Sequence, residues 1–267
     1  MIYDCFTFFN ELDLLEIRLN TLNECVDKFV LVEASRTQSL LSKPYHFEEN
    51  KERFKPFLDK IIHVKVDKYP DAGGWAMENY QRNCIVEGLQ QGALMADDIV
   101  GISDLDEIWD PNYLSDIKAS TEDYKFVSIG MKYLVFFLNL ETIEKKWTGT
   151  IFTKGGSLIN QTPQQLRNMK DHVSEIEEAG WHFGYQGGKE MVYKKYQSCI
   201  EPFDKSALPS FEKFSEEFDV RIKDGGSFIF SDNLGNDSVK LKKVEIGESY
   251  PDYIVQNKDK YKHLIYE

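Results

Sequence analysis

Three carboxylates follow closely on an apolar run near the middle of the sequence. The stretch DIVGISDLDEI places Asp104, Asp106 and Glu107 directly after residues typical of a buried strand. Like charges this close repel one another, so a positive group is expected beside them. Two aspartates two residues apart on a strand point to the same side of it, and carboxylate oxygens suit Mn²⁺ or Mg²⁺. The spacing therefore predicts a divalent-cation site at Asp104 and Asp106.

A single histidine lies in the aromatic stretch GWHFGY, at position 182. Such a histidine is often a packed, hydrogen-bonded core residue. However, Gly184, Gly187 and Gly188 follow it, and glycines let a backbone approach a ligand closely. Neutral imidazole also binds Mn²⁺ well. His182 is therefore either a core residue or a metal ligand.

Two further charged residues allow both a structural and a functional interpretation. Arg82 lies one helical turn after Glu78, which suits an intrahelical ion pair, but it could also contact a phosphate or carboxylate at the sheet edge. Glu33 ends an otherwise apolar strand, where a pocket role is the stronger interpretation.

Strand-like and helix-like segments alternate through the first half of the chain. Strands are expected at 3–9, 28–34, 60–66 and 98–104, with helices following Asn10 and over about 77–91. We expect Asn10 to cap its helix together with Asp13. This alternation predicts an α/β fold with a mostly parallel sheet flanked by helices. Ligands bind beyond the carboxyl ends of such strands. The polar residues at those ends are Asn10, Glu11, Glu33, Arg36, Asp104 and Asp106.

The second half of the chain is less regular. Residues 125–139 and 145–154 are typical of a β-ribbon, a short helix begins at Pro163, and 179–188 is a short strand closed by glycines. Neither a linker nor a repeat is visible, so a single domain over 1–267 is expected, with halves at 1–110 and 111–267.

Composition narrows the class of protein. The chain has 267 residues, of which 42% are hydrophobic, so it can bury a substantial core. Its formal net charge of −13 disfavours nucleic-acid partners. Neither a signal peptide nor a transmembrane segment is apparent, and the four cysteines show no metal-finger spacing. We therefore expect a cytoplasmic enzyme.

Several stretches together resemble a known family. FFNELDLLEIRLNTL, FVLVEASRT, ENYQRN, DDIVGISDLDEI and AGWHFGY occur in this order, and IKDGG follows as a weaker match. The chain resembles glycosyltransferase family 17, which includes the β-1,4-mannosyl-glycoprotein β-1,4-N-acetylglucosaminyltransferases. The resemblance implies a GT-A fold, a nucleotide-sugar donor, a glycan acceptor, a divalent cation and an inverting reaction. It points to UDP-GlcNAc as the donor.

The resemblance also implies roles for individual residues. Asp104 and Asp106 become a DxD pair that binds donor and metal, and His182 becomes a distal metal ligand. The first half then binds nucleotide and the second half binds acceptor. The residues expected to line the donor pocket are Asn10, Glu11, Glu33 and Arg82.

An inverting transfer needs a carboxylate that takes the acceptor's proton. The candidates are Asp224, in a glycine-flanked loop, Glu107 and Glu190. Animal family members carry a membrane anchor and a stem, which are not expected here. The stretch YKKYQSCIEPFDK departs from the family, which leaves acceptor choice open.

Two other functions fit parts of the pattern. A haloacid-dehalogenase-type phosphatase also places DxD after an apolar strand, but its nucleophilic aspartate lies in the first strand. A non-catalytic carbohydrate-binding domain could use Trp75, Trp147 and Trp181 to stack on sugar rings. Metal-dependent nucleotide-sugar turnover separates the enzyme from the binding domain.

Overall fold

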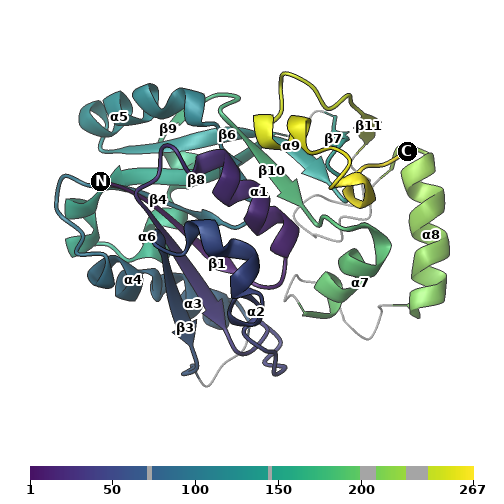
Figure 1. Ribbon diagram of the computed structural model, residues 1–267, viewed down its shortest axis with the longest axis horizontal. Coiled ribbons are helices and arrows are strands. Elements are labelled where there is room, and N and C mark those ends of the chain that lie inside the picture. Colours follow the sequence, from purple (N-terminus) through teal and green to yellow (C-terminus); the bar gives the residue numbers. More distant parts are fainter. Residues whose placement is uncertain (71–73, 144–145, 199–208, 227–239) are drawn as a thin grey trace.

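The structure is a computed structural model that describes residues 1–70, 74–143, 146–198, 209–226 and 240–267 (Figure 1). Its strands are β1 Ile2–Phe8, β2 Lys28–Ala34, β3 Ile61–Val66, β4 Ile99–Asp104, β5 Glu107–Trp109, β6 Phe126–Val135, β7 Leu140–Thr142, β8 Trp147–Lys154, β9 Ser174–Ile176, β10 Gly180–Gly184 and β11 Leu241–Lys243. Its α-helices are α1 Leu12–Leu22, α2 His46–Glu49, α3 Trp75–Asn83, α4 Ile85–Gln91, α5 Leu114–Asp123, α6 Pro163–Arg167, α7 Gly188–Ser198, α8 Phe211–Lys223 and α9 Asp252–Gln256.

The described strands form one mixed sheet in the order β11-β7-β6-β8-β4-β1-β2-β3. The strands β4, β1, β2 and β3 run parallel, as the alternation of strands and helices predicts. β8 then runs antiparallel to both β4 and β6, which confirms the predicted β-ribbon. β10 lies off this path and pairs with β5 and β6. The α/β fold class is confirmed, and the carboxyl ends of β1, β2 and β4 share one edge.

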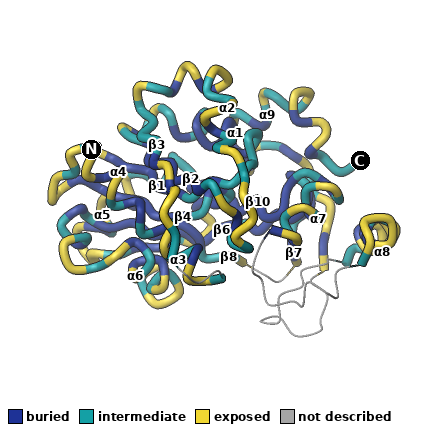
Figure 2. The backbone as a smooth tube through the Cα atoms, turned by 90° about the horizontal axis from the view of Figure 1, so that it is seen from below, coloured by how far each residue is buried: buried dark blue, intermediate teal, exposed yellow. Residues whose placement is uncertain are grey.

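Apolar side chains of β1 alternate between two core layers. Phe6 and Phe8 join the core that includes α1 and α9, whereas Tyr3 and Cys5 join the core under α3 and α4. This alternation follows from the two-residue period of a strand, and it requires helices on both faces of the sheet. Figure 2 shows the buried strands in the interior and the exposed residues mainly on the surrounding helices and loops.

Two local predictions are wrong. The helix expected over 77–91 is divided at Cys84 into α3 and α4. Asn10 does not cap α1, because the N-cap position belongs to Glu11 and makes no side-chain capping bond. Instead, the backbone N–H of Asn10 donates to Glu11 Oε2 at 3.0 Å.

Three of the four cysteines lie in the described residues. Cys5, Cys25 and Cys84 form no disulfide, and Cys199 lies outside the described residues. Within the described ranges, the helices are too short or too polar to cross a lipid bilayer.

Arg18 connects α1 to β1 and to the turn after β4. Its guanidinium group is fully buried and donates to both carboxylate oxygens of Asp4 at 2.7 Å. Its Nη1 also donates to the backbone carbonyls of Asp104, Leu105 and Glu107, at 3.0, 3.0 and 2.9 Å. One buried cation thus holds the backbone from which the three carboxylates project.

We predict that Arg18→Met lowers the free energy of unfolding by about 3–5 kcal/mol, because it leaves the buried Asp4 carboxylate without its countercharge. Urea denaturation measures the loss. The double variant with Asp4→Asn should lose less than Arg18→Met alone. A single variant as stable as the wild type would contradict this role.

Candidate active site

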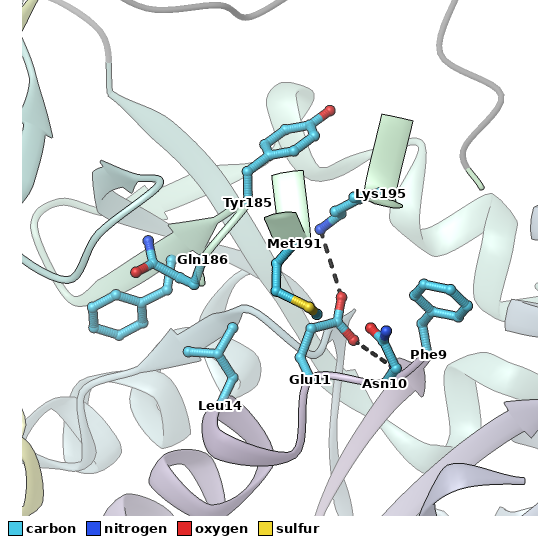
Figure 3. Close-up of a pocket in the computed structure, with 9 residues that line it drawn as sticks. Phe9, Asn10, Glu11, Leu14, Tyr185, Gln186, Met191 and Lys195 are labelled. Atoms are coloured by element: carbon cyan, nitrogen blue, oxygen red, sulfur yellow. Dashed lines mark hydrogen bonds and ion pairs between the residues drawn. The ribbon is translucent and has the colours of Figure 1, made fainter. Parts of the chain in front are cut away.

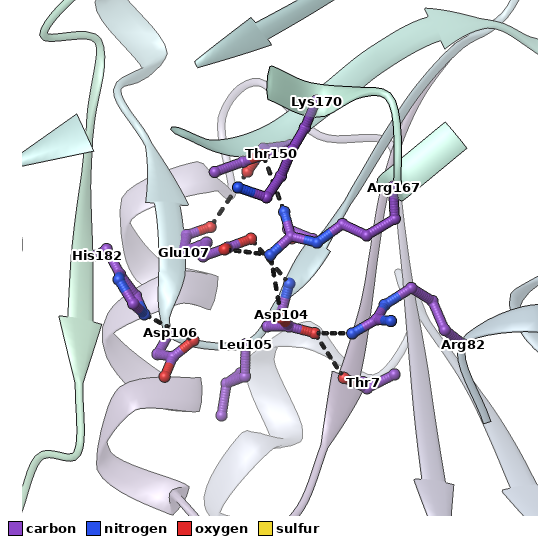
Figure 4. Close-up of polar contacts among 12 residues, drawn as sticks. Thr7, Arg82, Asp104, Leu105, Asp106, Glu107, Thr150, Arg167, Lys170 and His182 are labelled. Carbon is purple, nitrogen blue, oxygen red and sulfur yellow. Dashed lines mark hydrogen bonds and ion pairs between the residues drawn. The ribbon is translucent and has the colours of Figure 1, made fainter. Parts of the chain in front are cut away.

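The two aspartates of the DLD stretch point in different directions (Figure 4). The prediction that they share one side of a strand is wrong, because β4 ends at Asp104 and Asp106 lies in the following turn. Asp104 points toward Arg82 and Thr7, whereas Asp106 points toward His182. The structure thus separates the two predicted ligands.

Asp104 lies between two arginines. Its Oδ1 is 2.8 Å from Arg82 Nη2, and its Oδ2 is 3.1 Å from Arg167 Nη2. Burial raises the pKa of the Asp104 carboxyl, but the two guanidinium groups outweigh burial and hold it well below its usual range. Asp104 is therefore an ionised residue whose charge is already balanced by protein groups.

Arg82 forms ion pairs with two carboxylates of the protein itself. Its Nη2 is 2.9 Å from Glu78 Oε1, which is the expected intrahelical ion pair, and the same atom reaches Asp104. Its Nη1 donates to Gln164 Oε1 on α6. Burial lowers the pKa of Arg82, but Asp104 and Glu78 outweigh that effect and raise it. Arg82 is consequently a permanent cation at the carboxyl end of β4.

Glu107 lies wholly inside the protein. Its carboxylate forms an ion pair with Arg167 and accepts hydrogen bonds from Trp147 Nε1 at 2.6 Å and the Asp104 N–H at 3.1 Å. These contacts give Glu107 a structural role. Because its carboxylate is enclosed, it cannot take a proton from a glycan acceptor.

Asp106 and His182 lie beside each other at the sheet edge. His182 Nε2 is 3.6 Å from Asp106 Oδ1, and Lys195 Nζ is 3.3 Å from Oδ2. Burial raises the pKa of Asp106, but Lys195 and His182 outweigh burial and lower it to about 2. The imidazole stacks on Tyr133 and Trp147, with ring centroids 4.5 and 4.3 Å away. His182 is thus both packed in an aromatic cluster and directed at a carboxylate.

His182 Nε2 and Asp106 Oδ1, 3.6 Å apart, lie close enough for one cation to contact both atoms. Donor atoms at about 2.1 Å from an ion lie about 3.0 Å apart when their bonds meet at a right angle and about 3.6 Å apart when they meet at about 120°. Across the described residues, no group of three or more His, Cys, Asp or Glu side chains is arranged to hold a metal. His182 Nδ1 is buried without a described hydrogen-bond partner, so the ring is oriented by its aromatic neighbours and by the Asp106 carboxylate beside Nε2. A cation here needs further ligands from a bound molecule.

A small pocket adjoins this pair (Figure 3). Asn10 and Glu11, from the end of β1, face Met191 and Lys195 of α7 across it. Glu11 Oε1 is 3.7 Å from Lys195 Nζ. The structure therefore brings the predicted residues Asn10 and Glu11 close to Asp106, through Lys195.

Glu33 lies at the expected end of β2 but is fully buried. Its carboxylate contacts Lys43 Nζ at 3.3 Å, His63 Nε2 at 3.1 Å and the N–H of Phe47 at 3.2 Å. It holds α2 against the sheet and is not open to a ligand.

The other two candidate bases lie in the second half of the chain. Asp224 directly follows α8, at the side of the molecule away from β4 (Figure 1), and the next residue pairs with Leu241. Glu190 is exposed in the first turn of α7, the helix that also carries Lys195. The structure does not bring Asp224 to the Asp106–His182 pair.

Arg167 and Lys195 contact the candidate site, although the sequence pattern does not single them out. Arg167 offers no local signal, because its partners Asp104 and Glu107 are about 60 residues away. Lys195 offers a weak local signal in the sequence. It lies on α7 between the buried Val192 and Tyr196, where a charge is unexpected.

The fold and this site define an α/β protein with a charged pocket at the carboxyl edge of its parallel strands. Glycosyltransferase family 17 matches residues 1–200, which is most of the chain. The chain therefore belongs to glycosyltransferase family 17. The expected GT-A fold agrees with this membership and with the mixed sheet.

Named relatives cover nearly all of the chain. It is 24% identical to the beta-1,4-mannosyl-glycoprotein 4-beta-N-acetylglucosaminyltransferases of Rattus norvegicus and Homo sapiens, over 96% of its length. It spans 53% of each relative, about half. A solved structure of S. aureus TarS 1-349 in complex with UDP-GlcNAc is 12% identical, with a TM-score of 0.46 over 88% of this chain and 74% of that one.

We predict that Glu107→Gln lowers the free energy of unfolding by about 2–3 kcal/mol, because Arg167 loses a buried countercharge. Glu190→Gln makes the same chemical change at an exposed position and should cost less than about 0.5 kcal/mol. Thermal or urea unfolding of both variants measures the difference. Equal stability of the two would contradict a structural role for Glu107.

Proposed function

We propose that this chain is an inverting glycosyltransferase that moves a sugar from a UDP-sugar to a glycan acceptor. One observation carries the proposal. In a family 17 chain, the Asp106–His182 pair lies at the sheet edge where α/β proteins bind nucleotides, with Lys195 beside it. The first half, 1–110, supplies most of the donor site, and the second half, 111–267, supplies the acceptor site.

Asp106 and His182 are the residues that would hold a divalent cation, Mn²⁺ or Mg²⁺, in this proposal. The cation supplies Lewis-acid stabilisation of the negative charge on a departing diphosphate. Asp104 does not share this role, because Arg82 and Arg167 already balance its charge. Asp104 instead keeps the two arginines at the edge of the site.

The position of Asn10 and Glu11 at the carboxyl end of β1, close to Lys195, supports a nucleoside donor. A side-chain amide and a carboxylate can hydrogen-bond a ribose and a pyrimidine edge. The names of the curated relatives point to N-acetylglucosamine as the transferred sugar. We therefore propose UDP-GlcNAc as the donor.

The two competing functions lose support from the structure. Asp4 of β1 is fully buried and paired with Arg18, so it cannot serve as a phosphatase nucleophile. Of the three tryptophans considered for sugar stacking, Trp147 packs on His182 and Trp181 is buried, whereas Trp75 is 59% exposed. Of these three tryptophans, Trp75 is the one open to stack on a sugar ring.

We propose Glu190 as the carboxylate that takes the acceptor's proton, because it is exposed and directly precedes Met191, which lines the pocket. Glu190→Gln should lower the turnover rate about 100-fold or more while UDP affinity stays at the wild-type value. Steady-state kinetics and calorimetry measure the two quantities. A variant with wild-type turnover would remove Glu190 from this role.

The metal proposal predicts Mn²⁺-dependent binding of UDP and UDP-GlcNAc. Asp106→Asn and His182→Ala should each weaken Mn²⁺ binding about tenfold or more, equivalent to about 1.4 kcal/mol. Calorimetry and a turnover assay in EDTA measure this dependence.

Asp97→Asn is the matched control, because Asp97 is exposed near the opposite end of β4. This variant should bind Mn²⁺ and UDP as tightly as the wild type does. Full activity in excess EDTA would overturn the proposed role of the cation. The absence of any nucleotide binding would overturn the glycosyltransferase proposal.

A further inference from the structure

Lys195 is a cation placed between two carboxylates of the candidate site. Its Nζ lies 3.3 Å from Asp106 Oδ2 and 3.7 Å from Glu11 Oε1. Its side chain is 23% exposed, and the two carboxylates are 13% and 15% exposed. The ammonium group also lies 4.9 Å from the centre of the Tyr185 ring. Lys195 therefore neutralises a pair of poorly solvated negative charges at the pocket. Figure 3 shows its contact with Glu11.

A divalent cation between Asp106 and His182 would change the environment of this lysine. The cation would bind the carboxylate that Lys195 now contacts, and two positive groups so close together repel each other. The long, flexible lysine stem allows its compact charge to move without movement of α7. A diphosphate brought by a nucleotide would offer the displaced ammonium group a new partner.

We propose that Lys195 is a donor-binding residue with two partners: it neutralises Asp106 before the cation binds, and it contacts the diphosphate of the bound nucleotide afterwards. This inference rests on the proposed function and assigns the site a residue that competes with the metal yet supports the nucleotide. Removal of Lys195 should therefore strengthen Mn²⁺ binding and weaken nucleotide binding. Removal of a residue with a purely structural role would weaken the binding of both.

The test uses Lys195→Met, which keeps most of the side-chain volume and removes the charge. Manganese binding is followed by electron paramagnetic resonance without nucleotide, and UDP binding by calorimetry at saturating Mn²⁺. The variant should bind Mn²⁺ alone about threefold or more tightly and should bind UDP about tenfold or more weakly. Lys195→Arg should recover UDP affinity at least in part.

Lys194→Met is the matched control, because Lys194 is the exposed neighbour on α7. It removes the same charge and should leave both dissociation constants within about twofold of the wild type. Melting curves check that each variant is folded.

The outcomes separate this inference from the proposed function. Unchanged constants in Lys195→Met, or weaker binding of both Mn²⁺ and UDP, would overturn the role of Lys195 while leaving the glycosyltransferase proposal intact. Failure of the wild-type protein to bind UDP would overturn both.

Discussion

The buried contacts of Arg18 are the constraint on which the candidate site depends. Three carboxylates within four residues can project from one turn only if their charges are separated and balanced. Arg18 binds the backbone carbonyls of Asp104, Leu105 and Glu107 and takes its own countercharge from Asp4. The turn is thereby held so that each carboxylate meets a different environment.

The three carboxylates consequently have different chemical roles. Glu107 is enclosed with Arg167, and Asp104 lies between Arg167 and Arg82. Both are balanced by arginines, which remain charged at any physiological pH. Asp106 is balanced by a lysine, whose flexible side chain can move away, and it faces an imidazole, which can itself bind a metal ion. Within the turn, Asp106 is therefore the carboxylate best suited to exchange partners during a reaction.

Much of the fold could be predicted, because it follows from local patterns. The apolar runs of β1, β2 and β4 and the ribbon of β6 and β8 are visible in the sequence. The break at Cys84 is not, because apolar residues continue at helical spacing across it. The separation of Asp104 from Asp106 is equally hidden, since it depends on a contact to Arg18 that spans 86 residues.

The candidate site was harder to predict than the fold, because residue type shows neither burial nor partners. Glu33 has the sequence context of a pocket residue, yet Lys43 and His63 surround its carboxylate. The sequence offers Asp106, His182 and Glu11 as candidates because they follow strands or lie beside glycines. Arg167 lies on α6 and Lys195 on α7, in the second half of the chain. The sequence around these residues does not indicate that their side chains lie near the end of β4.

In the proposed function, Asp106 and His182 together bind the cation that accompanies the donor nucleotide. Anomalous X-ray scattering from crystals grown with Mn²⁺ and UDP would locate that cation. We expect one manganese peak coordinated by both Asp106 and His182 and by the UDP diphosphate. A manganese ion coordinated by other residues, or UDP bound away from this pair, would contradict it.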